Sequence, residues 1–228
     1  MGALKLVLFD IDGTLLISRG IGREAKRRAM LECFGRTGDL DNHVFGGKTD
    51  WGIAAELLAP YGITSAEVGR AMPGYEALMA RHMREIRGDY RADALPQALE
   101  LVCALRDRED ALVGLVTGNT GKTAAIKLEM AGFDPEWFAV GAFGHESAER
   151  AHLTRLALAR AQEIAGRAFK AADVIVIGDT PADIEAARAI DAVAVAVCTG
   201  YVSREELSCS DPDFLLADLS AFFELIQI

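Results

Sequence analysis

The sequence predicts an α/β fold: a parallel β-sheet with helices on both faces, and an all-helical segment inserted after the first strand. Two observations lead to this prediction. From about residue 95 onward, short apolar runs alternate with stretches of helical periodicity, and this alternation is typical of a parallel sheet with right-handed crossovers. Residues 19–92 carry mainly helical patterns.

The first strand is expected at residues 4–9, because a continuously apolar run suits a central strand that is buried on both faces. Helical periodicity follows at residues 22–34, 50–58 and 65–87. Pro73 lies inside the last of these ranges. We expect it to break or restart that helix, because proline lacks the amide hydrogen and its ring clashes with the preceding turn.

The rest of the sheet is expected after residue 95. Strands are predicted at 111–116, near 138–143, at 173–177 and at 192–197, helices at 95–106, 121–131, 147–165 and 182–190, and a last strand and helix over 213–226. The simplest organisation is one discontinuous Rossmann-like α/β domain, residues 1–15 and 93–228, interrupted by an all-helical domain, residues 16–92.

Composition and charge exclude several classes of protein. Of the 228 residues, 51% are hydrophobic and 25% are charged, a balance that supports a folded core and argues against intrinsic disorder. The net charge of −10 argues against a nucleic-acid partner, because binding to a phosphate backbone requires a positive excess. The apolar runs are far shorter than the ~20 residues of a membrane span, and Asp10 interrupts any secretory signal. We therefore expect a cytoplasmic protein without a membrane partner, of unknown oligomeric state.

The charge is distributed unevenly between the two parts of the chain. Residues 16–92 carry 12 Lys and Arg against 10 Asp and Glu, a net charge of +2, which leaves −12 for the remainder. Arg19, Arg23 and Lys26 fall near one face of a helix at spacings of four and three. They form either a solvated helix face or a group of cations that faces an acidic pocket and binds the phosphate or carboxylate of a substrate.

Two carboxylates stand where the first strand ends, in the segment Asp10-Ile11-Asp12-Gly13-Thr14. Open α/β sheets bind ligands at the carboxyl ends of their strands. A calcium-binding EF-hand loop also has carboxylates at alternate positions, but it requires glycine at the sixth position and a preceding helix, whereas Gly13 is fourth and follows a strand. Asp12 alone could cap the next turn, although that role leaves Asp10 unexplained.

A second pair of carboxylates, Asp179 and Asp183, follows the strand predicted at residues 173–177. If that strand lies beside the first one, Asp10 and Asp179 come within reach of one cation. Asp179 or Thr180 could instead be the N-cap of the following helix.

A third polar segment, Thr117-Gly118-Asn119, ends the strand predicted at residues 111–116. It offers a hydroxyl group and backbone amides at the edge of a helix, where phosphate oxygens bind readily. Three strand ends with complementary polar groups therefore point to one site.

These segments resemble, in order, the motifs of the haloacid dehalogenase (HAD) superfamily of phosphohydrolases. The four motifs correspond to residues 10–14, residues 117–119, a basic residue and residues 178–183. A chance Asp-x-Asp-Gly-Thr occurs in only about one chain in several hundred of this length. The helical insertion resembles the cap of the phosphoglycolate phosphatase and β-phosphoglucomutase branch, so the resemblance implies a HAD core with an inserted all-helical cap.

The resemblance implies catalytic roles for the first two motifs. Asp10 would be the nucleophile that forms an aspartyl-phosphate. Asp12 would act as general acid and base, with a pKa that neighbouring charge raises. Thr117 would donate to a phosphoryl oxygen, assisted by the amides of Gly118 and Asn119.

The resemblance also implies Mg²⁺ as cofactor. The ion would be held by the Asp10 carboxylate, the Asp12 backbone carbonyl and Asp179, since Mg²⁺ prefers oxygen ligands. Asp183 would be an indirect or alternate ligand.

The third motif departs from the family's pattern, which usually has Lys, commonly followed by Pro. Residues 144–150 offer Arg150 instead, and Lys127 is the competing candidate. We favour Arg150, because its predicted place where a loop becomes a helix suits the role, whereas Lys127 also fits an ordinary exposed helix residue. Arg can neutralise the same negative charge as Lys, but its positive charge is spread over a planar guanidinium group, whereas that of Lys is concentrated on one ammonium nitrogen.

Residues 45–50, Phe-Gly-Gly-Lys-Thr-Asp, resemble the substrate-facing loop of the cap. Glycines there permit close approach, and Lys48 or Asp50 would reach the leaving group. The same segment also fits an ordinary turn before the helix that begins at Asp50. The candidate substrate-binding residues are thus Gly118, Asn119, Lys48 and Arg23.

The function that the resemblance implies is a Mg²⁺-dependent phosphatase of a small phosphorylated metabolite, with phosphoglycolate as the type substrate. Asp12 favours phosphate esters, because the dehalogenases and phosphonoacetaldehyde hydrolases of the superfamily replace it. The alternative is a sugar-phosphate mutase similar to β-phosphoglucomutase. A non-catalytic metabolite-binding protein is disfavoured, because binding alone gains nothing from a nucleophile and an acid held at repelling distance.

Overall fold

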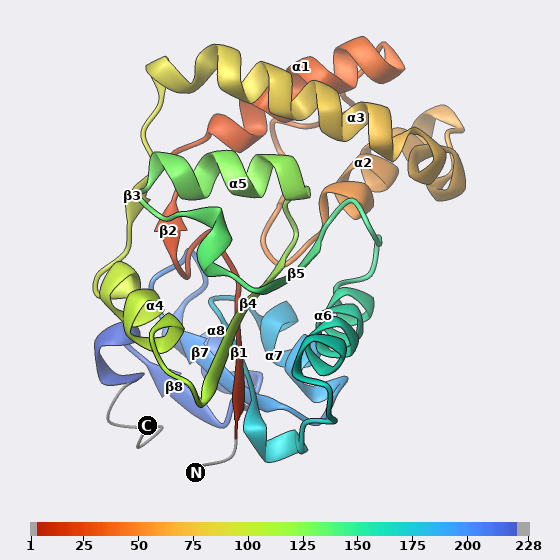
Figure 1. Cartoon of the computed structure of the whole chain (residues 1–228). Coiled ribbons are helices and arrows are strands. Elements are labelled where there is room, and N and C mark those ends of the chain that lie inside the picture. The colour runs from red at the N-terminus through yellow and green to blue at the C-terminus, as the bar shows by residue number, and fades with distance from the viewer. Residues whose placement is uncertain (1–3, 223–228) are drawn as a thin grey trace.

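The computed structural model describes residues 4–222. Its main sheet has six strands in the order β5-β4-β1-β6-β7-β8 (Figure 1), and every neighbouring pair is parallel. The strands are β1 (Lys5–Phe9), β4 (Ala111–Thr117), β5 (Val140–Phe143), β6 (Val174–Gly178), β7 (Val193–Val197) and β8 (Phe214–Leu216). The predicted α/β fold class is confirmed.

Helices cover both faces of this sheet because the side chains of each strand alternate between the faces. Val7 and Phe9 of β1 belong to the apolar cluster under α4 and α5, whereas Leu6 and Leu8 belong to the cluster under α6, α7 and α8. These helices are α4 (Ala98–Arg106), α5 (Gly121–Met130), α6 (Arg150–Ala165), α7 (Pro181–Arg188) and α8 (Arg204–Cys209). These four apolar side chains of β1 are fully buried, so helices on both faces of the sheet fix the strand that leads to the first motif.

Three further helices, α1 (Ile21–Phe34), α2 (Asp50–Leu58) and α3 (Ser65–Ile86), form a layer beyond the carboxyl ends of the strands (Figure 1). They have an apolar cluster of their own, which includes Ile53, Met72 and Tyr75. The chain enters this layer through β2 (Leu16–Ile17) and leaves it through β3 (Asp93–Ala94), and the two short strands pair antiparallel. We therefore keep residues 16–92 as a proposed cap domain, called the cap below.

Helix α3 contradicts the expectation for Pro73, because it continues through this residue from Ser65 to Ile86. A proline inside a helix removes one hydrogen bond, but packing can outweigh the loss. Met72 and Tyr75, on either side of Pro73, are almost completely buried. The helix also begins with a capping box, in which Thr64 and Glu67 bind each other's backbone amides.

Among the strands and α-helices of residues 4–222, three are absent from the sequence prediction: β2, β3 and α8. Each is too short to show a periodic pattern, with two, two and six residues. The last strand is confirmed as β8. Of the expected last helix, residues 219–221 form a single 3₁₀ turn, and residues 223–226 lie outside the described residues.

Among residues 4–222, no helix has the length and apolar character that crossing a membrane requires.

Candidate active site

A cavity of about 690 Å³ lies between the cap and the carboxyl ends of β1, β4 and β6. Its walls include the core residues Asp10, Asp12, Thr117, Gly118, Asn119, Lys127, Arg150 and Asp179, and the cap residues Arg19, Arg23, Lys26 and Lys48. All the predicted site residues except Asp183 therefore line one cavity, and Asp183 lies just behind it beside Asp10 and Asp179.

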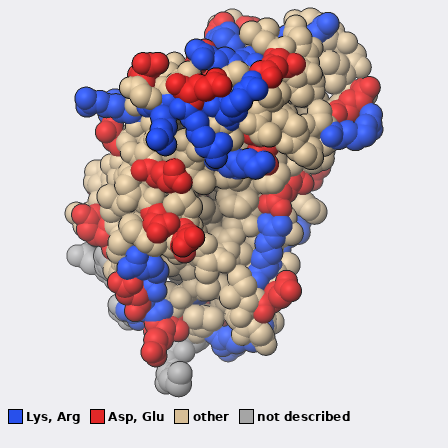
Figure 2. All heavy atoms as spheres, turned by 45° about the horizontal axis from the view of Figure 1, so that its top comes forward, with Lys and Arg blue, Asp and Glu red and all other residues tan. Residues whose placement is uncertain are grey.

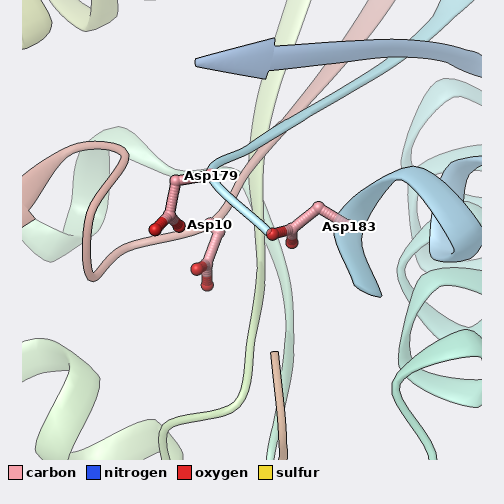
Figure 3. Close-up of side chains that lie close together, drawn as sticks. All are labelled: Asp10, Asp179 and Asp183. Carbon is pink, nitrogen blue, oxygen red and sulfur yellow. The ribbon is translucent and has the colours of Figure 1, made fainter. Parts of the chain in front are cut away.

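Two carboxylates of the cavity wall, Asp10 and Asp179, come together with Asp183. Figure 3 shows Asp10 and Asp179 leaving neighbouring strand ends and Asp183 approaching from the start of α7, and one oxygen of each lies within 4.8 Å of the others. Gly13 and Gly200 enclose Asp179, because a Cβ atom at either position would overlap its carboxylate. Glycine is therefore required at both positions, because any side chain there would collide with the Asp179 carboxylate.

The crowding of buried carboxylates changes their proton affinity. Burial raises the pKa of Asp10 to about 6, against the opposing charge of Arg150. Burial, together with the charges of Asp10 and Asp183, raises the pKa of Asp179 to about 8. A bound cation would remove this unfavourable repulsion.

Asp183 has both carboxylate oxygens occupied. Its Oδ1 pairs with the Arg150 guanidinium, and its Oδ2 accepts from the Thr180 amide at 3.0 Å and the Thr180 hydroxyl at 2.7 Å. Thr180, and not Asp179, is the N-cap of α7. This arrangement favours Asp183 as an indirect ligand and leaves Asp179 available to a cation.

Both candidates for the third motif lie in the site, but they contact different carboxylates. A terminal nitrogen of Arg150 lies 3.0 Å from Asp10 Oδ1 and also pairs with Asp183. Lys127 Nζ lies 2.6 Å from Asp12 Oδ2 and 2.7 Å from Asn119 Oδ1. The interpretation of Lys127 as an exposed helix residue is wrong, because only 5% of it is exposed.

Asp12 accepts hydrogen bonds from three side chains. Ser18 donates to its Oδ1 at 2.7 Å, and Asn119 and Lys127 donate to its Oδ2 at 2.7 and 2.6 Å. Burial alone would raise the pKa of Asp12, but Lys127 and the two neutral donors lower it below its usual value. The expectation of a raised pKa at Asp12 is therefore wrong for the ligand-free site, because its nearest charge is a cation.

The loop after β4 lies directly beneath the cap. Thr117 is fully buried, and its hydroxyl accepts from the Asn119 amide side chain at 2.9 Å. The Gly118 carbonyl accepts from the Asp50 amide at 2.7 Å, and a Cβ atom at Gly118 would overlap the carbonyl oxygen of Lys48. Only glycine allows the cap backbone to come this close to the second motif.

The cap cations differ in how they are neutralised. Arg19 pairs with Asp93 at 2.7 Å, Lys48 pairs with Glu56 at 2.6 Å, and Lys26 forms a buried pair with Asp50. Arg23 donates instead to the carbonyls of Leu40, Asp41 and His43, and its guanidinium lies 4.1 Å from the centre of the Phe45 ring. Among the cap cations of the described cavity wall, Arg23 alone has no carboxylate partner.

The basic residues of the cap divide between the outer surface and the cavity wall. Arg27 and Arg28, on the outer side of α1, pair with Asp41 and Glu24, and in Figure 2 blue and red side chains alternate on the upper part of the molecule. Arg23 and Lys26 face the cavity. Arg19 does so too, although it precedes α1 and does not share its helical spacing.

Two residues that contact the first motif were not predicted from the sequence. Ser18 binds Asp12, and Thr199 donates its hydroxyl hydrogen to the Gly13 carbonyl at 2.6 Å. Both lie in loops next to short or apolar strands, and no periodic or motif signal distinguishes them from ordinary loop hydroxyls.

Comparisons with known proteins agree with this geometry. A family model described as haloacid dehalogenase-like hydrolase matches residues 4–191. Phosphoglycolate phosphatase of Synechococcus elongatus is 24% identical over 225 residues, which cover 98% of this chain and 97% of the relative.

Solved structures share the fold across both the core and the cap. A hydrolase from Pseudomonas syringae has a TM-score of 0.70 at 23% identity, covering 98% of this chain and 99% of that one. A predicted phosphatase from Clostridium acetobutylicum has a TM-score of 0.69 at 18% identity, covering 99% of each chain. A protein from Bacteroides vulgatus, provisionally named beta-phosphoglucomutase, has a TM-score of 0.66 at 20% identity, covering 97% and 87%. The family match spans most of the chain and all four motifs, and the protein belongs to the haloacid dehalogenase-like hydrolases.

Proposed function

We propose that this hydrolase is a Mg²⁺-dependent phosphatase of a small phosphorylated metabolite and that Asp10 forms an aspartyl-phosphate during turnover. The observation that carries the proposal is the convergence of Asp10, Asp179 and Asp183 at the base of a cavity that also contains Asp12. A binding protein would gain nothing from this cluster, because its buried carboxylates repel one another.

The donor set fits Mg²⁺. The ion prefers carboxylate and carbonyl oxygens. Burial raises the pKa of Asp10 and of Asp179, and a bound cation would stabilise the ionised form of both groups. Asp10 and Asp179 would hold the ion with the Asp12 carbonyl, and Asp183 would act through Arg150 and Thr180. When bound, the ion would neutralise charge on the phosphoryl group.

The chain's own residues supply the remaining chemistry. An Asp10 oxygen would form a bond to phosphorus as the bond from phosphorus to the leaving oxygen breaks, and Asp12 would give that oxygen a proton. The negative charge of the phosphoryl group would raise the pKa of Asp12 and counteract Lys127. In the second step, Asp12 would take a proton from the water that hydrolyses the aspartyl-phosphate. Thr117 and the amides of Gly118 and Asn119 would bind the phosphoryl oxygens.

A phosphoglycolate-like substrate is supported by the name of the Synechococcus elongatus relative. Arg23 and Lys48 lie on the cap side of the cavity, where they would bind the part of the substrate that leaves. Arg23 is the better candidate for a carboxylate, because Lys48 already pairs with Glu56.

The test is phosphate release from a panel of phosphorylated metabolites, with and without a chelator. We expect Mg²⁺-dependent release that falls by more than about 10³-fold in Asp10→Asn. Asp89→Asn is the matched control, because Asp89 is exposed in the cap. Retained turnover in Asp10→Asn would overturn the proposal. Isomerisation of a sugar phosphate that needs a bisphosphate activator and outpaces phosphate release would identify a mutase instead.

A further inference from the structure

The two buried cations of the core divide the catalytic carboxylates between them. Arg150 contacts Asp10 and Asp183, and Lys127 contacts Asp12. Within residues 4–222, no ion pair joins Arg150 to Asp12 or Lys127 to Asp10. The third-motif position and Lys127 are therefore not interchangeable sources of positive charge.

The surroundings of the Lys127 ammonium form a fitted site. Asp12 Oδ2 and Asn119 Oδ1 lie 2.6 and 2.7 Å from Nζ. The third neighbour is Gly22 of the cap helix α1, where a Cβ atom would lie 3.1 Å from Nζ. Burying an ammonium group costs free energy unless its partners are well placed. The two close oxygen partners, and a glycine at position 22 that leaves room for the ammonium group, therefore indicate a specific role for Lys127.

Lys127 is one of three donors to the Asp12 carboxylate, which points into the cavity. The side chain of Asp12 is 38% exposed, whereas that of Asp10 is 9% exposed. Asp12 does not belong to the cluster formed by Asp10, Asp179 and Asp183. The contacts with Lys127, Asn119 and Ser18 therefore hold this carboxylate toward the cavity and away from the proposed metal position.

We propose that Lys127 is a positioning residue that holds Asp12 where it can protonate the leaving oxygen. Arg150 instead forms an ion pair with the nucleophile Asp10. This inference rests on the proposed phosphatase function. In the step concerned, the bond from phosphorus to the leaving oxygen breaks as the bond to the Asp10 oxygen forms. The leaving oxygen keeps the electron pair and takes the proton of Asp12.

Dependence on the leaving group tests this role. 4-Nitrophenyl phosphate has a leaving group that departs without a proton, whereas an alkyl phosphate needs one. The comparison uses kcat/KM, which covers the steps up to departure of the leaving group and excludes the hydrolysis of the aspartyl-phosphate that both substrates share. We expect Lys127→Met to lower kcat/KM for the alkyl phosphate by about 10²-fold or more and for 4-nitrophenyl phosphate by less than about 10-fold. Arg150→Met should lower both to a similar extent, because it affects attack by Asp10.

Two controls separate positioning from folding. Lys122→Met makes the same change on the same helix, at a side chain that is 52% exposed, and should leave both rates unchanged. Lys127→Arg keeps the charge and should recover part of the alkyl phosphate activity. Lys127→Gln, which removes the charge, serves as the test variant if Lys127→Met does not fold.

The alternative outcomes are distinct. Equal losses of kcat/KM for both substrates in Lys127→Met would overturn the positioning role. Failure of the wild-type enzyme to release phosphate from either substrate would instead overturn the proposed function, and this inference with it.

Discussion

Asp10 and Asp179 illustrate the conflict between stability and function at single residues. Both carboxyl groups are buried, and both have a raised pKa. Their protonated forms are therefore favoured in the folded protein relative to the unfolded chain, whose carboxyl groups titrate near 3.8. The arrangement is unfavourable when both groups are ionised and no cation is present.

This conflict predicts a pH dependence of stability. Between the unfolded pKa near 3.8 and the folded values of about 6 and 8, the folded protein binds more protons than the unfolded chain. Stability in the presence of a chelator should therefore fall as pH rises through this range, by at most about 1.4 kcal/mol per pH unit for each group. Thermal unfolding at pH 5 and pH 8.5 measures the effect.

Mg²⁺ and one variant provide the controls for this prediction. Mg²⁺ should raise the melting temperature more at pH 8.5 than at pH 5, because the ionised cluster binds it more tightly. Asp179→Asn should reduce the fall of stability with pH. A chelated wild-type protein that becomes more stable from pH 5 to pH 8.5 would contradict the account.

Helix α5 joins the cap to the segments of the proposed active site. Asp50 of α2 accepts from the Thr120 amide at 2.9 Å, and Glu76 of α3 accepts from the Lys122 amide at 3.0 Å. Two cap carboxylates thus bind the amino-terminal amides of α5, where the helix dipole favours negative charge. Lys127, farther along the same helix, contacts Asp12.

The buried pair between Lys26 and Asp50 allows a stability prediction. Asp50→Asn can keep the hydrogen bond to the Thr120 amide but leaves a buried lysine without its counter-ion, so the free energy of unfolding should fall by about 3–5 kcal/mol. The double variant Lys26→Met/Asp50→Asn should recover much of this loss. Urea denaturation measures both.

An exposed cap pair is the control for that experiment. Glu32 pairs with Arg81, and both side chains are more than 40% exposed, so Glu32→Gln should change the free energy of unfolding by less than about 1 kcal/mol. If Asp50→Asn has an effect as small as Glu32→Gln, the buried pair does not stabilise the contact between cap and core.

At the scale of the whole molecule, the sequence predicts the core better than the cap contacts. The strands that carry Asp10, Thr117 and Asp179 are short apolar runs followed by polar segments, and this local pattern is sufficient to place three strand ends at one edge of a sheet. Parallel pairing of β1 with both β4 and β6 then brings these residues together.

The place of Lys127 could not be predicted in the same way. Helical periodicity shows which side of α5 is polar, but it does not show whether that side faces solvent or a second layer. The layer above α5 comes from residues far away in the sequence, including Gly22 and Glu76. The lowered pKa of Asp12 likewise depends on Lys127 and Asn119, which lie far from Asp12 in the sequence.

The central claim is that Asp10 carries the phosphoryl group during turnover, and acid-quench mass spectrometry tests it most directly. The enzyme is mixed with Mg²⁺ and a substrate found in the metabolite panel, stopped in acid within one turnover, and digested. The account predicts one phosphoryl group on the peptide that contains Asp10 and none in Asp10→Asn. Rapid turnover without phosphorylation of Asp10, or phosphorylation of another residue, would contradict it.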